Sequence, residues 1–330
     1  MLILAKSILG LMLGFVLSLI TAVILIPILK KLKAGQTVSR LINKRHLKKD
    51  GTPTLGGLIF IIPTIVVMGL LYLRGSIEIT PSLTILIFVF LAYALLGFVD
   101  DYKKIKNKNN KGISTINKLI LQTVIALIFY VIFIKYGGDT NLIISSLGIN
   151  IPLGWAFGIF ILLVLVGTAN AVNITDGLDG LCGGLSVMSF LAYGVIAWGT
   201  SWLAGYQEIA IFSFILMGSI LGFLVFNTHP AKVFMGDTGS LALGGALATI
   251  AILTRHELSL LIIGGVFVVE TLSSLIQIIA IRKYKTKVFK KAPLHHHFEE
   301  LGWIETDIVK LFWTIGLLLA MLGILYGVWL

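Results

Sequence analysis

Five aspartates lie at or just beyond the ends of long apolar runs. Asp100 and Asp101 end one run in GFVDDYKK, Asp176 and Asp179 follow a second in NITDGLDG, and Asp237 follows a third in FMGDTGS. A carboxylate near a bilayer is costly unless it contacts water, a partner or a metal ion. Acids repeated at such positions therefore predict a functional site, provided that they share one side of the membrane.

The adjacent pair Asp100 and Asp101 indicates a bound cation. Two neighbouring carboxylates repel each other, which favours either a raised pKa on one of them or a divalent ion between them. Mg²⁺ prefers hard oxygen ligands and usually binds one or two carboxylates together with substrate phosphates. Asp237 lies in GDTGS, where glycines let the backbone approach a ligand, although helix capping alone could also explain an aspartate there.

The stretch NAVNITDGLDG carries polar side chains at three-residue spacing: Asn170, Asn173, Asp176 and Asp179. A helix would place them on one face, whereas the two glycines after the aspartates favour a turn. Paired amides offer donors and acceptors that suit a nucleobase or sugar edge better than a metal. Phe234 is either an ordinary interfacial aromatic or a platform on which a base stacks.

Three contiguous histidines, His295, His296 and His297, occur in KKAPLHHHFEELGW. Neighbours in sequence rarely point at one centre, so a tight metal site is not expected. Imidazoles beside Lys290 and Lys291 fit better with binding phosphate oxygens or exchanging protons near neutral pH. An ordinary surface helix is the alternative interpretation.

Glu270 is the only acid deep within an apolar run, in VFVVETLSS. An acid inside a membrane is by default a functional hypothesis. Pairing with Thr271, Ser273 or a neighbouring helix explains Glu270 at least as well, so we do not place it in the predicted site.

The composition requires membrane helices to position these residues. Of 330 residues, 57% are hydrophobic and 12% charged, and the mean hydropathy of +1.00 is outside the range of a water-soluble domain. About 20 apolar residues cross a hydrocarbon core as a helix. The sequence therefore predicts an all-α polytopic membrane protein, a single domain over 1–330, with about ten transmembrane helices near residues 7–29, 55–73, 82–99, 117–135, 155–172, 182–200, 208–226, 240–254, 259–281 and 308–328.

The basic residues predict the topology, because lysine and arginine concentrate in cytoplasmic loops. All but four of the 26 fall in alternate loops that share one side, the exceptions being Lys6, Arg74, Lys135 and Arg255. Both termini are therefore expected on the extracytoplasmic side and all five aspartates on the cytoplasmic side. We expect the cytoplasmic loops 30–54, 100–116, 173–181, 227–239 and 282–307 to form the active site.

Three further features limit the function. The net charge of +11 is spread over loops beside apolar runs, which indicates orientation and lipid binding rather than nucleic acid. A single cysteine, Cys182, excludes an intramolecular disulfide framework and a multi-cysteine metal site. The alternating stretch 140–153 predicts a short β-hairpin on the outer side.

Five motifs together resemble the family of phospho-N-acetylmuramoyl-pentapeptide transferases. They are GTPTLGG at 51–57, FVDDYKK at 98–104, NAVNITDGLDGL at 170–181, FNTHPAKVFMGDTGSLALGG at 226–245 and PLHHHFEELGW at 293–303. The aspartate motifs are shared with the wider superfamily of polyprenyl-phosphate sugar-1-phosphate transferases. The PLHHHFE string indicates the muramoyl-pentapeptide branch.

This resemblance implies transfer of phospho-N-acetylmuramoyl-pentapeptide from UDP-N-acetylmuramoyl-pentapeptide to undecaprenyl phosphate. The products are lipid I and UMP, Mg²⁺ is the cofactor, and the pathway is peptidoglycan biosynthesis. It also implies a multi-pass protein of the bacterial inner membrane with a cytoplasmic active site. The lipid bilayer is an expected partner, nucleic acid is not, and a homodimer is left open.

The resemblance also implies roles for individual residues. Asp237 resembles the principal metal ligand, Asp100 the carboxylate that handles the acceptor phosphate, and Asp101 a neighbour that shares either role. Lys118 resembles a phosphate-binding residue, although a snorkelling anchor is its ordinary interpretation. The remaining substrate-binding candidates are Asn170, Asn173, Asp176, Asp179, Asn227, Phe234, His295, His296, His297, Lys49 and Thr54.

Two other functions are open to these motifs. A transferase for UDP-N-acetylglucosamine would share the aspartates but differ in its sugar loop. A cation or nucleotide-sugar transporter would carry polar residues at mid-membrane depth in several helices, whereas most polar motifs here gather at one face. Transfer itself could be direct or could pass through a phosphorylated aspartate, and we favour the direct route.

Overall fold

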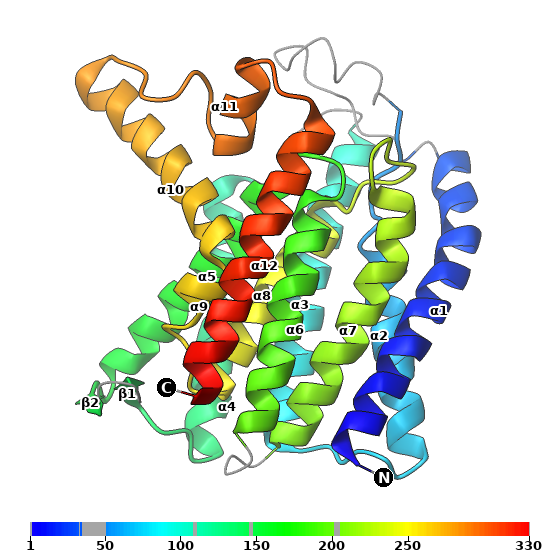
Figure 1. Cartoon of the computed structure of the whole chain (residues 1–330), viewed down its shortest axis with the longest axis vertical. Coiled ribbons are helices and arrows are strands. Elements are labelled where there is room, and N and C mark those ends of the chain that lie inside the picture. Colours follow the sequence, from blue (N-terminus) through cyan, green and yellow to red (C-terminus); the bar gives the residue numbers. More distant parts are fainter. Residues whose placement is uncertain are drawn as a thin grey trace.

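The computed structural model describes residues 2–32, 34, 51–107, 111–144, 148–200 and 205–329, and these form a bundle of long helices (Figure 1). The helices are α1 (Ile3–Lys31), α2 (Leu58–Leu73), α3 (Pro81–Lys106), α4 (Thr115–Lys135), α5 (Ala156–Thr175), α6 (Leu181–Gly199), α7 (Tyr206–Asn227), α8 (Gly236–Leu253), α9 (Leu260–Ile263), α10 (Gly265–Ile279), α11 (Leu294–Glu300) and α12 (Glu305–Trp329). A π-helical turn, Ala280–Tyr284, continues α10.

Within the described residues, nine helical segments are long and apolar enough to cross a membrane, and α2 is a shorter apolar helix of 16 residues. These segments match the ten predicted runs, so the all-α polytopic fold is confirmed. The eighth run, the shortest expected, is the central helix α8. It is buried from Thr238 to Leu253, because α3, α5 and α6 pack around it.

The ninth run is broken, whereas the sequence predicted one continuous helix over 259–281. The break lies at Gly264, between α9 and α10, and glycine pairs are a common cause of sharp kinks. A Cβ at Gly264 would lie 2.8 Å from the Leu260 carbonyl oxygen. Beyond the break, α10 leans away from the bundle (Figure 1).

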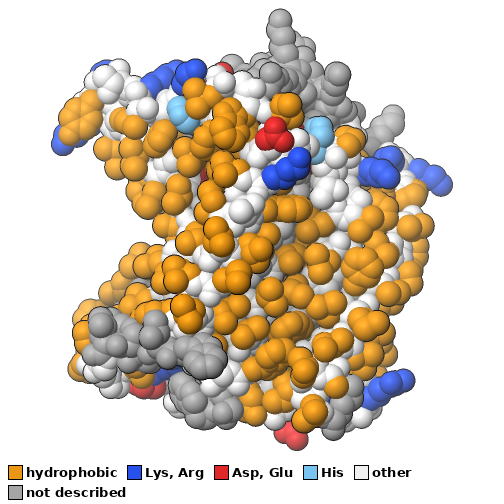
Figure 2. Space-filling view, in the orientation of Figure 1, with side chains coloured by type: hydrophobic (Ala, Val, Ile, Leu, Met, Phe, Trp, Pro, Cys, Tyr) orange, Lys and Arg blue, Asp and Glu red, His pale blue; other side chains and the backbone are white. Residues whose placement is uncertain are grey.

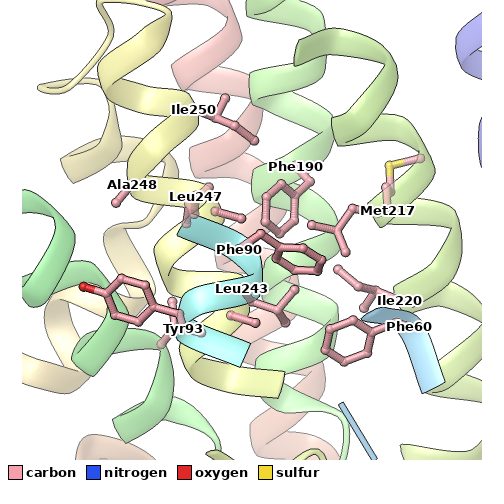
Figure 3. Packing of buried hydrophobic residues seen from close by; sticks show 14 of the residues in the cluster. Phe60, Phe90, Tyr93, Phe190, Met217, Ile220, Leu243, Leu247, Ala248 and Ile250 are labelled. Carbon is pink, nitrogen blue, oxygen red and sulfur yellow. The ribbon is translucent and has the colours of Figure 1, made fainter. Parts of the chain in front are cut away.

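Aromatic side chains and glycines pack the centre of the bundle. Phe90 meets Phe212 edge-on with ring centroids 5.5 Å apart, and the core around it is continuous across α2, α3, α7 and α8 (Figure 3). In lipid, small residues allow helix backbones to approach closely. A Cβ at Gly97 of α3 would lie 2.1 Å from the Asp237 carbonyl oxygen, so only glycine permits this crossing of α3 and α8.

The hairpin predicted near 140–153 is present as β1 (Asn141–Ile144) and β2 (Ile149–Pro152), paired antiparallel. An ion pair between Arg255 and Asp139 links its base to the turn after α8. In Figure 1 the hairpin and both chain ends lie at one end of the bundle, and α11 lies at the other.

An apolar groove runs between α5, α8, α9 and α10 and encloses about 320 Å³. Figure 2 shows a hollow with hydrophobic side chains on one side of the molecule, between the projecting end of α10 and the hairpin end. The groove lining includes Leu163, Leu261 and Leu272, which are exposed. The groove is therefore open to the side that faces lipid.

Glu257 lines the groove from the turn after α8 and is only 4% exposed. Its Oε1 has no hydrogen-bond partner within the part of the chain that the structure describes. Burial raises the pKa of Glu257 to about 7, although its own backbone N–H and the charge of Arg255 oppose the shift.

We expect Glu257→Gln to stabilise the protein at high pH. The folded state holds a proton that the unfolded state releases near pH 4.5, so wild-type stability falls as the pH rises through 4.5 to 7 and stays low above. Glutamine removes this loss, which we put at about 1–3 kcal/mol at pH 8.5 and close to nothing at pH 4.5. Thermal unfolding in detergent at pH 5 and 8.5 measures the difference.

The exposed acid Glu78 supplies the matched control, because Glu78→Gln should shift the melting temperature little at either pH. If Glu257→Gln changed stability equally at both pH values, the buried carboxylate would not be the titrating group.

Candidate active site

Three of the predicted acids meet where α3 ends and α8 begins. Ligand atoms of Asp100, Asp101 and Asp237 all lie within 4.8 Å of one another, although 136 positions separate Asp101 from Asp237. The close crossing at Gly97 brings the two helix ends together. The predicted convergence of these three acids is therefore present in the fold.

Asp101 caps the central helix α8. Its Oδ1 accepts the backbone N–H of Asp237 at 3.1 Å, and its Oδ2 accepts the backbone N–H and hydroxyl of Thr238 at 2.9 and 2.7 Å. The first N–H groups of a helix have no partner within it, and a carboxylate there also interacts favourably with the helix dipole. Asp101 therefore fixes the helix that presents Asp237.

Two lysines bridge Asp100 and Asp237. Lys118 Nζ lies 2.6 Å from Asp237 Oδ2 and 3.4 Å from Asp100 Oδ1. Lys104 Nζ lies 2.6 Å from Asp100 Oδ2 and 3.2 Å from Asp237 Oδ2. Our sequence interpretation missed Lys104 as a site residue, although its spacing of four from Asp100 on a helix could have indicated the pairing.

The three carboxylates differ in their exposure to solvent. The side chains of Asp100 and Asp101 are 1% and 3% exposed, and that of Asp237 is 15% exposed. Asn173 donates from Nδ2 to Asp237 Oδ1 at 2.9 Å and to Ser240 at 2.8 Å, which holds the Asp237 carboxylate from the α5 side. Asp237 is thus the acid best placed to meet a ligand from solution.

The NITDGLDG stretch is a turn, as its glycines suggested. Asp176 is the first residue after α5, and Gly180, with φ near +80°, directly precedes α6. Burial, followed by the charges of Asp237, Asp101 and Asp179, raises the pKa of Asp176 to about 8. Asp176 therefore lies within electrostatic reach of the acid cluster.

Asp179 has partners that the sequence interpretation missed. Its Oδ2 accepts His229 Nδ1 at 3.0 Å and the Ala231 backbone N–H at 3.1 Å, while its own N–H donates to Glu305 Oε1 at 2.8 Å. His229 Nδ1 also lies 3.5 Å from Glu305 Oε2. Glu305 is 126 positions from Asp179, so spacing gave no indication of this contact.

Asn227 holds two loops together. Its Oδ1 accepts the Gly180 N–H at 3.1 Å, and its Nδ2 donates to the Val233 carbonyl at 2.9 Å. Phe234 follows, half-buried, and its N–H donates to the Pro53 carbonyl at 2.8 Å. The loop before α8 is therefore pinned between α6 and the segment before α2.

The structure places two candidates at the edges of this site and leaves one undescribed. Thr54 is buried, and a Cβ on Gly236 would contact both its hydroxyl and the Asp101 carboxylate. Asn170 lies one helical turn from Asn173 and donates to Gln122 Oε1 at 2.9 Å. Lys49 lies outside the described residues.

The three histidines have three different partners. His295 Nδ1 lies 2.8 Å from Glu270 Oε2, His296 Nδ1 lies 2.6 Å from Glu299 Oε2, and His297 Nδ1 accepts the Lys290 N–H at 3.1 Å. Burial lowers the pKa of His296.

Glu270 is therefore connected to one of the predicted substrate-binding residues. The sequence interpretation leaves Glu270 outside the site and expects Thr271, Ser273 or a neighbouring helix as its partner. The expected pairing with a neighbouring helix is confirmed, because the carboxylate contacts His295 of α11. The Ser273 hydroxyl donates to the Glu270 backbone carbonyl instead of the carboxylate.

Comparison with known proteins shows which family the chain belongs to. Residues 83–255 match the model of glycosyl transferase family 4. Over 319 residues, 97% of both chains, the protein is 50% identical to a Bacillus subtilis protein named phospho-N-acetylmuramoyl-pentapeptide-transferase. A Bacillus pumilus protein of the same name is also 50% identical, over 96% of both chains.

The chain belongs to the phospho-N-acetylmuramoyl-pentapeptide-transferase family. The resemblance that its motifs indicated is thereby confirmed. The family 4 match in this transferase covers the acid cluster and the loops of Asp179 and Asn227, and it ends before the histidines.

We expect Asp101→Ala to destabilise the transferase by about 2–3 kcal/mol, because two helix N–H groups and a hydroxyl lose a charged acceptor. Thr238→Val, which removes one of these bonds, should cost about 1 kcal/mol. Asp237→Asn removes the charge opposite Lys104 and Lys118, but both ammonium groups keep Asp100 as a partner, so it should lower the stability less than Asp101→Ala does. Thermal unfolding of the three variants in one detergent measures this order, and an unaffected Asp101→Ala protein would rule out the capping role.

Proposed function

We propose that the transferase moves phospho-N-acetylmuramoyl-pentapeptide from its UDP carrier to undecaprenyl phosphate and releases UMP. The proposal rests on the cluster of Asp100, Lys104, Lys118 and Asp237 near the end of α3 and the start of α8. The chain that carries this cluster is 50% identical to a named transferase over almost its whole length. The cluster combines carboxylates for a metal with ammonium groups for phosphates. The five loops predicted from sequence would together form this one active site.

The acid cluster suits Mg²⁺. Its donors are hard carboxylate oxygens, as Mg²⁺ prefers, and they can approach one centre. Asp237 would hold the ion because it is the most accessible, with Asp101 as the second candidate ligand. Both Asp101 oxygens already accept hydrogen bonds from α8, so any further coordination would use their remaining lone pairs. Bound there, Mg²⁺ would neutralise diphosphate charge and stabilise the charge on departing UMP.

Direct attack requires little of the protein beyond positioning and charge. An oxygen of undecaprenyl phosphate forms a bond to the β-phosphorus of the donor as the bond from that phosphorus to UMP breaks. A phosphate monoester with a second pKa near about 6 is mostly ionised at neutral pH, so no strong base is needed. Asp100 would orient the acceptor phosphate through Lys104 and Lys118, which it already contacts.

The donor nucleotide would lie beside the acids. Asp179 and Phe234 are the candidates for contact with the base, and Asn173 and Asp176 for the diphosphate side. Asn227 would act mainly by holding the two loops that carry them, because both ends of its amide are engaged. Donor binding would also involve three residues of α11, His295, His296 and His297.

The apolar groove is our candidate for the acceptor chain. It follows α5 from Phe160 to Ala171, two residues before Asn173, so a lipid in the groove would bring its head group toward the acids. Its lining is almost wholly apolar and it opens toward the bilayer, as a polyprenyl chain requires.

Filling the groove tests this assignment. Gly167 lines the groove and has open space where a Cβ would stand. Gly167→Phe should raise the KM for undecaprenyl phosphate about tenfold or more, because lost apolar contact of some 50 Å² corresponds to about 1.3 kcal/mol. The KM for the donor should stay the same. Gly69→Phe, on an exposed face of α2 with equally open space, is the matched control. An unchanged acceptor KM in Gly167→Phe would exclude the groove.

We infer the orientation of the protein in the membrane from the distribution of its basic residues. Lysines and arginines gather at the end of the molecule that carries the acids, which we assign to the cytoplasm (Figure 2). Cytoplasmic access agrees with a soluble nucleotide donor. The relatives are bacterial, so we assign the protein to the inner (plasma) membrane of a bacterial cell.

The central experiment measures UMP release from UDP-N-acetylmuramoyl-pentapeptide by purified protein with undecaprenyl phosphate. We expect release to require Mg²⁺, to stop with a chelator, and to fall by about 100-fold or more in Asp100→Asn and in Asp237→Asn. Asp237→Asn should in addition need more Mg²⁺, which a titration would show. Near-normal turnover in both variants would refute the site.

Two further outcomes distinguish the other functions. Faster release from UDP-N-acetylglucosamine than from the muramoyl donor would assign a different sugar specificity. A phosphorylated enzyme formed with donor alone, and competent to react with acceptor, would replace direct attack by the two-step route.

A further inference from the structure

Glu270 lies in the middle of α10 and is fully buried. Both of its oxygens face His295: Oε1 accepts the backbone N–H at 3.1 Å, and Oε2 contacts Nδ1 at 2.8 Å. An acid inside a membrane helix is costly, and a neutral residue would pack there at less cost. A carboxylate at this position therefore indicates a task that involves the imidazole.

The Glu270 carboxyl group favours one tautomer of His295. Its Oε2 is placed to accept a hydrogen bond from Nδ1 when that nitrogen carries the proton. In the neutral imidazole the lone pair then stays on Nε2. That nitrogen is buried and has no hydrogen-bond partner within the described ranges.

His295 Nε2 points at the loop between α5 and α6. A Cβ on Gly177 would lie 2.2 Å from it, so the ring rests against the backbone of this glycine. Gly177 directly follows Asp176 and precedes Asp179 by two residues. The ring thus supports the loop whose aspartates we assign to the donor.

A separate contact already fastens the segment that carries His295. Gln277, two turns beyond Glu270 on α10, accepts the N–H groups of Val288 and Phe289 and donates to the Phe289 carbonyl. The segment between α10 and α11 is therefore held against α10 by contacts that do not involve Glu270. Glu270 adds the orientation of one ring.

We propose that Glu270 is a positioning residue for the donor site: it holds the His295 ring, with its proton on Nδ1, against Gly177 and thereby fixes the loop that carries Asp176 and Asp179. This inference rests on the proposed function, because it assumes that this loop binds the nucleotide donor.

Glu270→Gln tests the proposal with a minimal change of shape. The amide can still accept the His295 backbone N–H, but its NH₂ then faces Nδ1 and favours the tautomer with the proton on Nε2. We expect a rise of about tenfold or more in the donor KM, an acceptor KM within about twofold of wild type, and a melting temperature close to wild type. His295→Ala should show the same donor defect, and the double variant should be no worse than the single ones, because both changes remove one contact.

Gln277→Ala is the control, because it removes a contact that holds the segment before α11 without touching His295. It should lower the melting temperature while leaving the ratio of donor KM to acceptor KM unchanged. A wild-type donor KM in Glu270→Gln, equal rises in both KM values, or additive effects in the double variant would each overturn the proposal. If Glu270→Gln does not fold, His295→Ala alone carries the test with the same criteria for the two KM values.

Failure of the proposed function gives a different result. If wild-type protein releases no UMP from the muramoyl donor but does so from UDP-N-acetylglucosamine, the substrate assignment fails and the same variants are compared with that donor. If neither donor reacts, calorimetric binding of UMP to wild type and Glu270→Gln decides the proposal: about tenfold weaker binding by the variant supports it, and equal or undetectable binding overturns it.

Discussion

The N-terminus of α8 is the constraint on which the rest of the site depends. This helix is enclosed by protein along its length, so its first N–H groups cannot all be hydrated and require acceptors from elsewhere in the chain. Asp101 of α3 supplies them. The same pairing sets the register of α3 against α8, and with it the distance between Asp100 and Asp237. A contact that looks purely structural therefore assembles the chemistry.

Each part of the site is held by a contact between distant segments of the chain. Asp101 fixes α8, Glu305 and the Asp179 loop hold each other, and Glu270 orients His295. All three contacts place a carboxylate against backbone N–H groups or an imidazole. Such pairs suit the edge of a membrane, because a buried carboxylate without a partner would be far more costly than a paired one. The polar site can thus be built from helices that are otherwise apolar.

Much of the fold could be predicted from periodicity and length. The ten apolar runs, the hairpin and the turn at DGLDG follow from local composition, which acts over a few residues. The break at Gly264 could not be predicted from periodicity and length, because a glycine pair kinks a helix only where the surrounding helices leave room. Lys104 was missed although its spacing from Asp100 was informative, since we counted it only toward topology. His229 and Glu305 offered no such spacing.

The sequence by itself determined that the protein spans a membrane, which family it resembles and which acids gather at one face, because hydropathy, basic loops and motif letters are local properties. Only the tertiary structure decided how those acids divide their work. Asp101 caps a helix, Asp237 keeps access to solvent, and Asn170 faces Gln122. These differences arise from helix crossings and burial, which join residues from 48 to 137 positions apart and therefore leave no trace in local spacing.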